Sequence, residues 1–263
     1  MQIRFLVACG AALTQLATPA ESKGLFDGKW VADLSTQSGL SEDIYLVQNG
    51  IYTCNSCSPL REYPADGKLH SIPGDSEITT ESVAVTGPRT IVTRIVSPAL
   101  ARTTTMTVAA DDKTATYVSI DHRPGIKGPL RTVYLARRTK NGPSGAHAVS
   151  GTWQGIRYVA VPKEVRTTEL RKEGDRLFYR TPLGVSFVAT YGGGFVPVEG
   201  PFRGKFLVSV EREGNRKIVE TVQQDGKIIA LRSFKLAPNG RSIEIATTNV
   251  ATHSVFRTTA RKQ

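Results

Sequence analysis

The sequence predicts an all-β protein made of two tandem antiparallel up-and-down barrels, each with about eight strands. Two observations carry this prediction: the chain repeats itself after about half its length, and each repeat is rich in short strand-like segments. We therefore expect a signal peptide over residues 1–20, a first barrel over 24–138, a linker over 139–146 and a second barrel over 147–263.

The repeat is anchored by the only two tryptophans of the chain. They lie in Gly28-Lys29-Trp30 and Gly151-Thr152-Trp153, 123 residues apart. Further matches keep their order and nearly the same offset, ending with Ala136-Arg137-Arg138 and Ala260-Arg261-Lys262, 124 residues apart. Chance matches would not be expected to keep their order, so we infer a tandem duplication.

Both repeats contain runs of four to nine residues rich in Val, Ile, Thr, Tyr and Phe, the composition of β-strands. Asn49-Gly50, Asp225-Gly226 and Asn239-Gly240 predict tight hairpin turns, because both central residues of a type I′ turn need positive φ. No long stretch has a helical period. The predicted strands include residues 44–47, 91–96, 103–108, 131–135, 177–180, 185–191, 217–222, 228–236 and 242–247.

The first twenty residues have the pattern of a secretory signal peptide. Arg4 precedes a mostly apolar run over residues 5–16, and Thr18-Pro19-Ala20 places small residues at a cleavage site. We therefore expect a periplasmic or secreted protein, without a transmembrane segment. The alternative is a lipoprotein anchored at Cys9, but it leaves only residues 5–8 for an apolar region that needs about 7–15 residues.

In an oxidising compartment, Cys54 and Cys57 are expected to form a small structural disulfide. The alternative is a thioredoxin-type redox pair. That motif opens a helix, whereas Cys57 is followed by Ser58-Pro59-Leu60 with no amphipathic helix behind it. Haem attachment needs a His after the second Cys, and a zinc site needs two further ligands. We therefore predict neither a cofactor nor a metal site.

The net charge of +11 lies mostly in the second repeat. Residues 24–138 contain 12 Lys and Arg against 12 Asp and Glu, whereas residues 146–263 contain 19 against 10. A basic exported domain attracts anionic partners such as lipid head groups or cell-envelope polymers. We expect no specific nucleic-acid partner.

A Gly-x-Trp at the start of a first strand, meandering strands and an Arg in the last strand together resemble the lipocalin-like (calycin-type) barrels. The pattern occurs twice, as Trp30 with Arg137 and as Trp153 with Arg261. The resemblance implies that each Trp closes one end of its barrel and that the Arg packs across its ring, a contact worth roughly 0.5–2 kcal/mol. It implies no activity, since the bacterial exported lipocalin-like proteins that share the pattern are uncharacterised.

No enzymatic motif is present in the sequence. It lacks Gly-x-Ser-x-Gly, His-Glu-x-x-His and a Gly-rich phosphate loop. The four histidines are scattered, and the paired carboxylates fall at strand ends or turns. We therefore predict a non-enzymatic protein with no catalytic residues.

Strand parity makes Arg157 a candidate ligand-binding residue. If Trp153 faces the barrel interior, so do Gly155 and Arg157, and an inward guanidinium would need a carboxylate or phosphate partner. The alternative is that Gly155 allows a β-bulge, which flips the parity and returns Arg157 to solvent. Arg180, in another strand of the basic repeat, is the second candidate.

Three functions follow from these features. The first is a binding protein in which one or both barrels hold a small apolar or amphiphilic ligand, with an anionic head group near Arg157 and Arg180. The second is an envelope interaction or structural protein with filled barrels, which uses the basic surface of the second repeat. The third is thiol redox exchange through Cys54 and Cys57.

Overall fold

The computed structural model describes residues 24–74, 78–201 and 203–263. The predicted signal peptide and Cys9 lie outside the described residues. Within the described part the chain forms twenty β-strands and no helix, which confirms the all-β prediction. Each of the nine predicted runs overlaps an observed strand.

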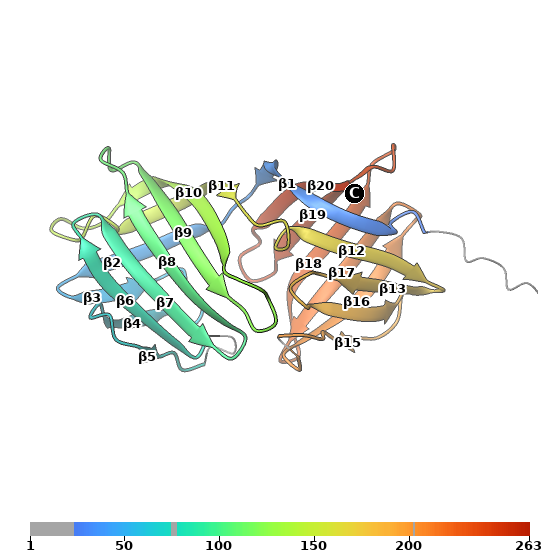
Figure 1. Ribbon diagram of the computed structural model, residues 1–263, viewed down its shortest axis with the longest axis horizontal. Helices are drawn as coiled ribbons and strands as arrows, with labels where there is room; N and C mark the ends of the chain where they lie inside the picture. The colour runs from blue at the N-terminus through green and yellow to red at the C-terminus, as the bar shows by residue number, and fades with distance from the viewer. Residues whose placement is uncertain (1–23, 75–77, 202) are drawn as a thin grey trace, which may run out of the picture.

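The strands form two ten-stranded antiparallel sheets, and each sheet curves into a barrel (Figure 1). The spatial order in the first, here called barrel I, is β4 (Arg61–Pro64), β3 (Ile51–Cys54), β2 (Glu42–Gln48), β11 (Gly151–Ala160), β10 (Leu130–Asn141), β9 (Thr114–His122), β8 (Leu100–Val108), β7 (Thr90–Ser97), β6 (Thr80–Gly87) and β5 (His70–Ser71). A bridge between Asp66, just after the edge strand β4, and Ala84 on β6 brings the two ends of this sheet together.

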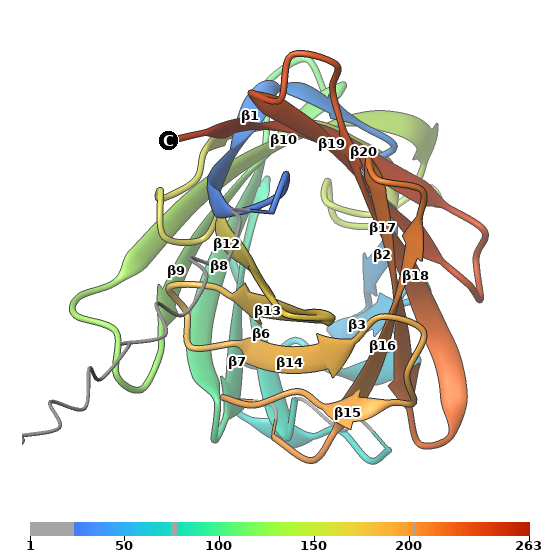
Figure 2. The ribbon, with the colours of Figure 1, turned by 90° about the vertical axis from the view of Figure 1, so that its right-hand side faces the viewer.

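The second sheet, here called barrel II, has the same plan, and Figure 2 looks along it. Its spatial order is β14 (Ser186–Thr190), β13 (Arg176–Arg180), β12 (Thr167–Glu173), β1 (Gly28–Ser38), β20 (Val255–Lys262), β19 (Ser242–Asn249), β18 (Lys227–Leu236), β17 (Lys217–Gln224), β16 (Phe206–Glu213) and β15 (Val196–Pro197). Bridges from Ser186 to Glu199 and from Tyr191 to Val210 join its edges. The count exceeds the expected eight strands because short edge strands such as β5 and β15 complete each barrel.

Each barrel takes its Trp strand from the other repeat. β1, which carries Trp30, pairs with β12 and β20. β11, which carries Trp153, pairs with β2 and β10. In Figure 1 the blue strand β1 accordingly lies among the yellow and red strands of barrel II.

This strand exchange corrects the predicted domain boundaries. The strands of barrel I lie within residues 42–160, and those of barrel II lie within residues 24–38 and 161–263. Of the predicted linker, residues 139–141 end β10, and residues 142–146 begin its connection to the neighbouring strand β11 of the same barrel. The two barrels are connected instead by the short segments after β1 and after β11. Both Trp strands carry the same Gly-x-Trp pattern, so the local sequence did not distinguish their partners.

The two Trp side chains are fully buried and equivalent in their surroundings. The indole Nε1–H of Trp30 donates to the Phe26 carbonyl at 2.8 Å, and that of Trp153 donates to the Val149 carbonyl at 2.8 Å. Gly28 and Gly151, which begin the two motifs, have φ of 143° and 130°, a region that favours glycine. Both Gly-x-Trp motifs therefore adopt the same local structure, with a positive φ at the glycine and an indole hydrogen bond to the carbonyl four residues before the Trp.

The cations over the two indole rings are not the expected ones. The Arg138 guanidinium lies 4.2 Å from the centroid of Trp153, and the Lys262 ammonium lies 5.2 Å from that of Trp30. Each cation is directly opposite its Trp in the strand ladder. The expected partners Arg137 and Arg261 lie one position earlier, where the alternation of the strand turns them to solvent.

The bulge alternative at Gly155 is confirmed. The ladder pairs Leu135 with Arg157 but Ala136 with Gly155, so β11 contains one extra residue at this point. Arg157 is therefore exposed, as this alternative implies, and the inward orientation that made it a candidate does not occur. A Cβ at Gly155 would overlap the Tyr134 hydroxyl, which explains why glycine occupies the bulge.

Candidate ligand-binding site

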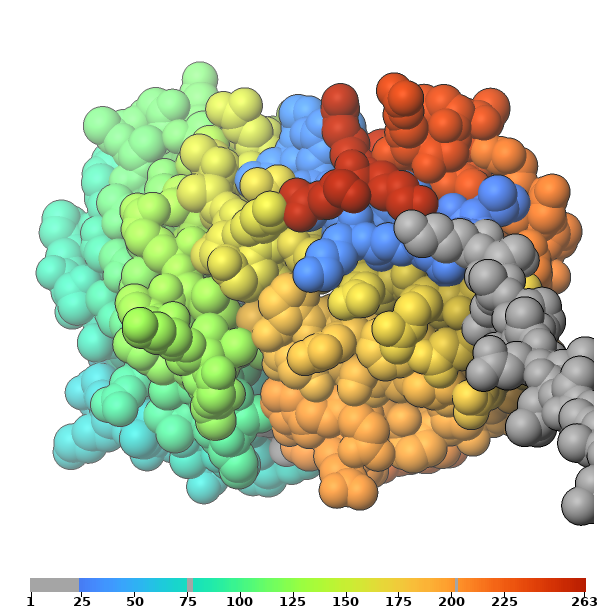
Figure 3. Space-filling view, turned by 45° about the vertical axis from the view of Figure 1, so that its right-hand side comes forward, coloured from blue at the N-terminus to red at the C-terminus, as the bar shows by residue number. Residues whose placement is uncertain are grey.

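A cavity of about 590 Å³ lies where the two barrels meet. Its walls come from β1 and the β19–β20 end of barrel II, from β8 and β9 of barrel I, and from both connecting segments. In the space-filling view, the blue and yellow segments around β1 and β11 lie between the two barrels (Figure 3). The volume is within the ~300–1,000 Å³ of small-molecule sites. We call it the junction cavity.

Part of the junction cavity is apolar. Its apolar side chains come from barrel II and from the two segments that connect the barrels. The apolar side chains that line it are Ala32, Leu34, Leu40, Val161, Val165 and Phe256.

The charged part of the junction cavity contains three arginines and one aspartate. Arg102 donates from Nε and Nη2 to the two carboxylate oxygens of Asp121 at 2.6 and 2.8 Å. Arg123 donates to the same carboxylate at 3.3 Å. Burial raises the pKa of Asp121, but its hydrogen bonds and the charges of both arginines outweigh this and hold the pKa below its usual value. One carboxylate thus serves two guanidinium groups.

Arg166 has no carboxylate partner in the contacts that the structure shows. Its Nη1 donates to the Ala32 carbonyl at 2.9 Å, which is uncharged. The Nε–H groups of Arg123 and Arg166 are buried and have no acceptor among the described residues. Because three cations face one anion, the lining carries an excess of positive charge. An anion in the cavity would balance this excess charge.

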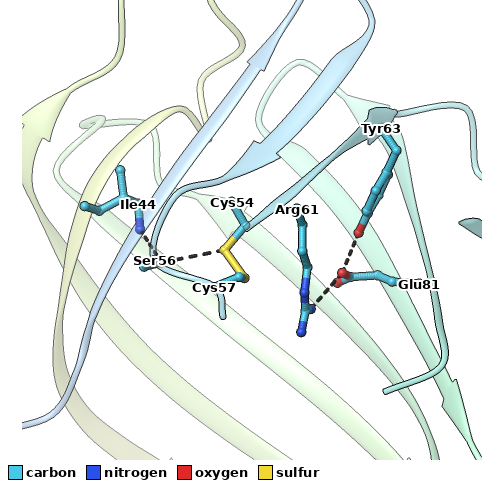
Figure 4. The surroundings of a disulfide bond; sticks show 7 residues. All are labelled: Ile44, Cys54, Ser56, Cys57, Arg61, Tyr63 and Glu81. Atoms are coloured by element: carbon cyan, nitrogen blue, oxygen red, sulfur yellow. Dashed lines mark hydrogen bonds and ion pairs between the residues drawn. A yellow bond between two sulfur atoms is a disulfide. The ribbon is translucent and has the colours of Figure 1, made fainter. Parts of the chain in front are cut away.

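A second cavity of about 160 Å³ lies inside barrel I. Its lining includes Arg61, whose Nη1 donates to Glu81 Oε2 at 2.8 Å, and the Tyr63 hydroxyl donates to the same oxygen (Figure 4). The predicted disulfide between Cys54 and Cys57 is confirmed and borders this interior, with 5.4 Å between the Cα atoms. Arg102 lines both this cavity and the junction cavity.

Barrel II has an apolar core with one buried charge pair. Glu220 is 2% exposed, and one of its oxygens lies 3.6 Å from Arg232 Nη1. Burial raises the pKa of Glu220, and the Arg232 charge acts in the opposite direction. The rest of the core is a continuous cluster of apolar side chains that includes Trp30, Leu170 and Phe234.

The sequence-based candidates do not contribute to either cavity. Arg157 and Arg180 are exposed and line neither. The arginines that line the junction cavity were missed. The pairing of Arg102 with Asp121 could have been found from the β8–β9 hairpin, but the position of Arg166 depends on the strand exchange, which no motif encodes.

Among the described residues, no group of three His, Cys, Asp or Glu side chains is placed to hold a metal ion. The described segments also contain no helix with the length and apolar character needed to cross a bilayer.

Comparison of the chain with models of known protein families, with curated proteins and with solved structures finds no match in any of the three. The lipocalin-like resemblance therefore stays a prediction. The structure establishes the coarser statement that the chain forms two antiparallel ten-stranded barrels with exchanged Trp strands.

Proposed function

We propose that this protein is an exported, non-enzymatic binding protein that holds a small amphiphilic anion in the junction cavity. The observation that carries the proposal is the combination of an apolar surface with three arginines that line the cavity beside a single carboxylate, that of Asp121. A carboxylate, sulfate or phosphate group would balance the remaining positive charge. The apolar part of the same ligand would bury itself against side chains such as Leu34 and Phe256.

The exported location rests on two features of the chain. Residues 1–20 have the pattern of a signal peptide. The Cys54–Cys57 disulfide is typical of oxidising compartments. Because Cys54 is buried at the end of a strand, away from any helix N-terminus, these cysteines favour a structural role over thiol exchange.

The experiment that tests the proposal is a comparison of dodecanoate with dodecanol as ligands of the mature protein, by isothermal titration calorimetry. We expect dodecanoate to bind more tightly because only it carries the anion. Arg166→Gln should weaken dodecanoate about tenfold, since a hydrogen bond to a charged group contributes ~1.5–3 kcal/mol. Arg180→Gln, at an exposed arginine outside the cavity, is the matched control.

Two results would contradict the proposal. One is equal affinity for the acid and the alcohol, and the other is an equal effect of Arg166→Gln and Arg180→Gln. Arg123→Gln is a second variant, in case Arg166→Gln disturbs β1 through its bond to Ala32. Native mass spectrometry of protein isolated from its own compartment would add the mass of the natural ligand.

A second candidate function is favoured by the charge of barrel II. After the strand exchange, barrel II contains 19 Lys and Arg against 12 Asp and Glu, and barrel I contains 13 against 10. An envelope interaction protein would use this basic surface on anionic polymer or lipid head groups. Salt-sensitive binding to anionic vesicles, unaffected by Arg166→Gln, would favour this function over the first.

A further inference from the structure

The junction cavity has a polar side and an apolar side. Its apolar side chains, which include Leu34 and Phe256, come from barrel II and from the segments that connect the barrels. No aliphatic side chain among the described residues of barrel I lines it. The residues that barrel I contributes are Arg102, Ser119, Asp121, Arg123, Thr132 and Tyr158. An amphiphile in this cavity would therefore place its head group against barrel I and its apolar part toward barrel II.

A row of hydroxyl groups crosses the inner wall of barrel I next to these charges. Four paired positions on neighbouring strands form the row, namely Thr93 on β7, Thr104 on β8, Ser119 on β9 and Thr132 on β10. Paired residues share one face of a sheet, and each of the four lines a cavity, so the row faces inward. Ser119 lies two residues before Asp121 on the same strand, so the hydroxyls adjoin the charged part of the junction cavity.

Two of these hydroxyls are available to a ligand in the junction cavity. The Thr132 side chain is half-buried and lines the cavity, and its hydroxyl makes no hydrogen bond with the described residues. The Ser119 hydroxyl lies 2.9 Å from that of Thr104, and a hydroxyl that makes one hydrogen bond can still make another. Because hydroxyls both donate and accept, hydroxyl groups of a ligand are suitable partners at both positions.

The hydroxyl row is not a requirement of the barrel fold. At four successively paired positions, strands β17 to β20 of barrel II carry Glu220, Arg232, Thr247 and Phe256. Glu220 and Arg232 form the buried charge pair of that barrel, and Phe256 belongs to the apolar side of the junction cavity. The two barrels therefore present different chemistry to the same cavity, as expected if they bind the two ends of an asymmetric ligand.

We propose that the ligand of the junction cavity is an anionic amphiphile whose head group also carries hydroxyl groups. The head group lies in the mouth of barrel I, where its anion balances the arginine charge and its hydroxyls bond to Ser119 and Thr132. The apolar part extends toward Leu34 and Phe256 of barrel II. This inference rests on the function proposed above, which it narrows from any small amphiphilic anion to one with a hydroxylated head group.

Isothermal titration calorimetry of the full-length mature protein with dodecyl glucuronide tests the inference against two matched ligands. Dodecanoate has an alkyl chain and a carboxylate without the hydroxyls, and dodecyl glucoside has the hydroxyls without the charge. We expect the glucuronide to bind about tenfold more tightly than dodecanoate, since two added hydrogen bonds contribute about threefold each. It should also bind about tenfold more tightly than the glucoside, because only the glucuronide carries the anion.

Two variants locate the head group. Thr132→Val removes one hydroxyl and nearly keeps the shape of the side chain, so it should weaken the glucuronide about threefold and leave dodecanoate unchanged. Ser119→Ala should do the same, and it guards against a local disturbance of β10 by Thr132→Val. Thr247→Val is the matched control, since Thr247 lines the same cavity from barrel II, and it should change the affinity of neither ligand.

Three results would overturn the inference. They are a glucuronide that binds no more tightly than dodecanoate, an effect of Thr247→Val as large as that of Thr132→Val, and equal losses of both ligands in Thr132→Val. A row of hydroxyls that binds only water would give the first of them. The function proposed above fails on a different result, namely equal affinity for dodecanoate and dodecanol. Tighter glucuronide binding that Thr132→Val weakens would then still support the hydroxylated head group.

Discussion

Gly155 decides which side chains of β11 reach the interior of barrel I. The predicted cost of Gly155→Ala follows from the contacts of an added Cβ, which would overlap the Tyr134 hydroxyl and lie 2.7 Å from Leu40 Cβ. Overpacking of this kind destabilises by about 1–3 kcal/mol. Urea unfolding of Gly155→Ala should show a loss of this size, and Gly155→Ala with Tyr134→Phe should recover part of it. Gly194→Ala, where a Cβ meets nothing within 4 Å, is the control.

Asp43 is predicted to make the stability of the protein depend on pH. Burial, together with the Glu42 charge, raises its pKa from 3.8 to about 6. The folded state therefore holds this proton to a higher pH than the unfolded state, so the free energy of unfolding falls as pH rises from about 4 to about 6. Relative to Asp43→Asn, the wild type should lose about 2 kcal/mol over this range. A difference between the two proteins that does not vary with pH would contradict this assignment.

At the scale of the strand, the exchange of β1 and β11 can be tested by cross-linking. Lys29 on β1 lies opposite Glu169 on β12, and opposed Cα atoms are about 4.5–5.5 Å apart, within the range of a disulfide. Lys29→Cys with Glu169→Cys should therefore form an intramolecular disulfide on mild oxidation, seen by peptide mass mapping of the monomer. If the repeats were separate barrels, this pair would not form. If this disulfide instead joined two protein molecules, β1 of one molecule would be paired with β12 of the other.

The strands themselves could be predicted from the sequence, whereas their partners could not. Composition and the turns at Asn49-Gly50 and Asp225-Gly226 are local signals, and both turns have the positive φ expected. At Asn239-Gly240 only the glycine has positive φ, so the same dipeptide forms a different turn. The choice of neighbours for β1 depends on contacts between residues more than 100 positions apart, and two similar Trp strands give no local signal that distinguishes them.

The candidate site could not be predicted from the sequence because it also depends on contacts between residues distant in the chain. Arg123 and Arg166 lie in connecting segments, where an exposed arginine is the ordinary expectation. They line one cavity only because the two barrels meet with β1 on one side and β8 and β9 on the other. Parity along a single strand drew attention to Arg157 instead, and the bulge at Gly155, the alternative considered with it, returns that side chain to solvent.

At the scale of the whole molecule, the exchange predicts that loss of the Trp in one repeat destabilises the barrel that the other repeat mainly forms. Trp30 is fully buried in the core of barrel II, and Trp153 in that of barrel I. Replacing a buried Trp by Ala costs about 3–5 kcal/mol. Trp30→Ala should therefore lower hydrogen-exchange protection most strongly in strands β12 and β17–β20, which lie more than 130 residues further along the chain.

Trp153→Ala is the reciprocal variant and the internal control, because it should lower protection in β2, β3 and β6–β10 instead. Loss of protection by Trp30→Ala in β6–β9 would show that each repeat folds with its own Trp strand, and would remove the basis of the junction cavity. If the two variants act reciprocally, each barrel depends on a Trp strand supplied by the other repeat. Neither barrel would then be complete as a separate repeat, and a ligand between them would contact parts of both repeats at once.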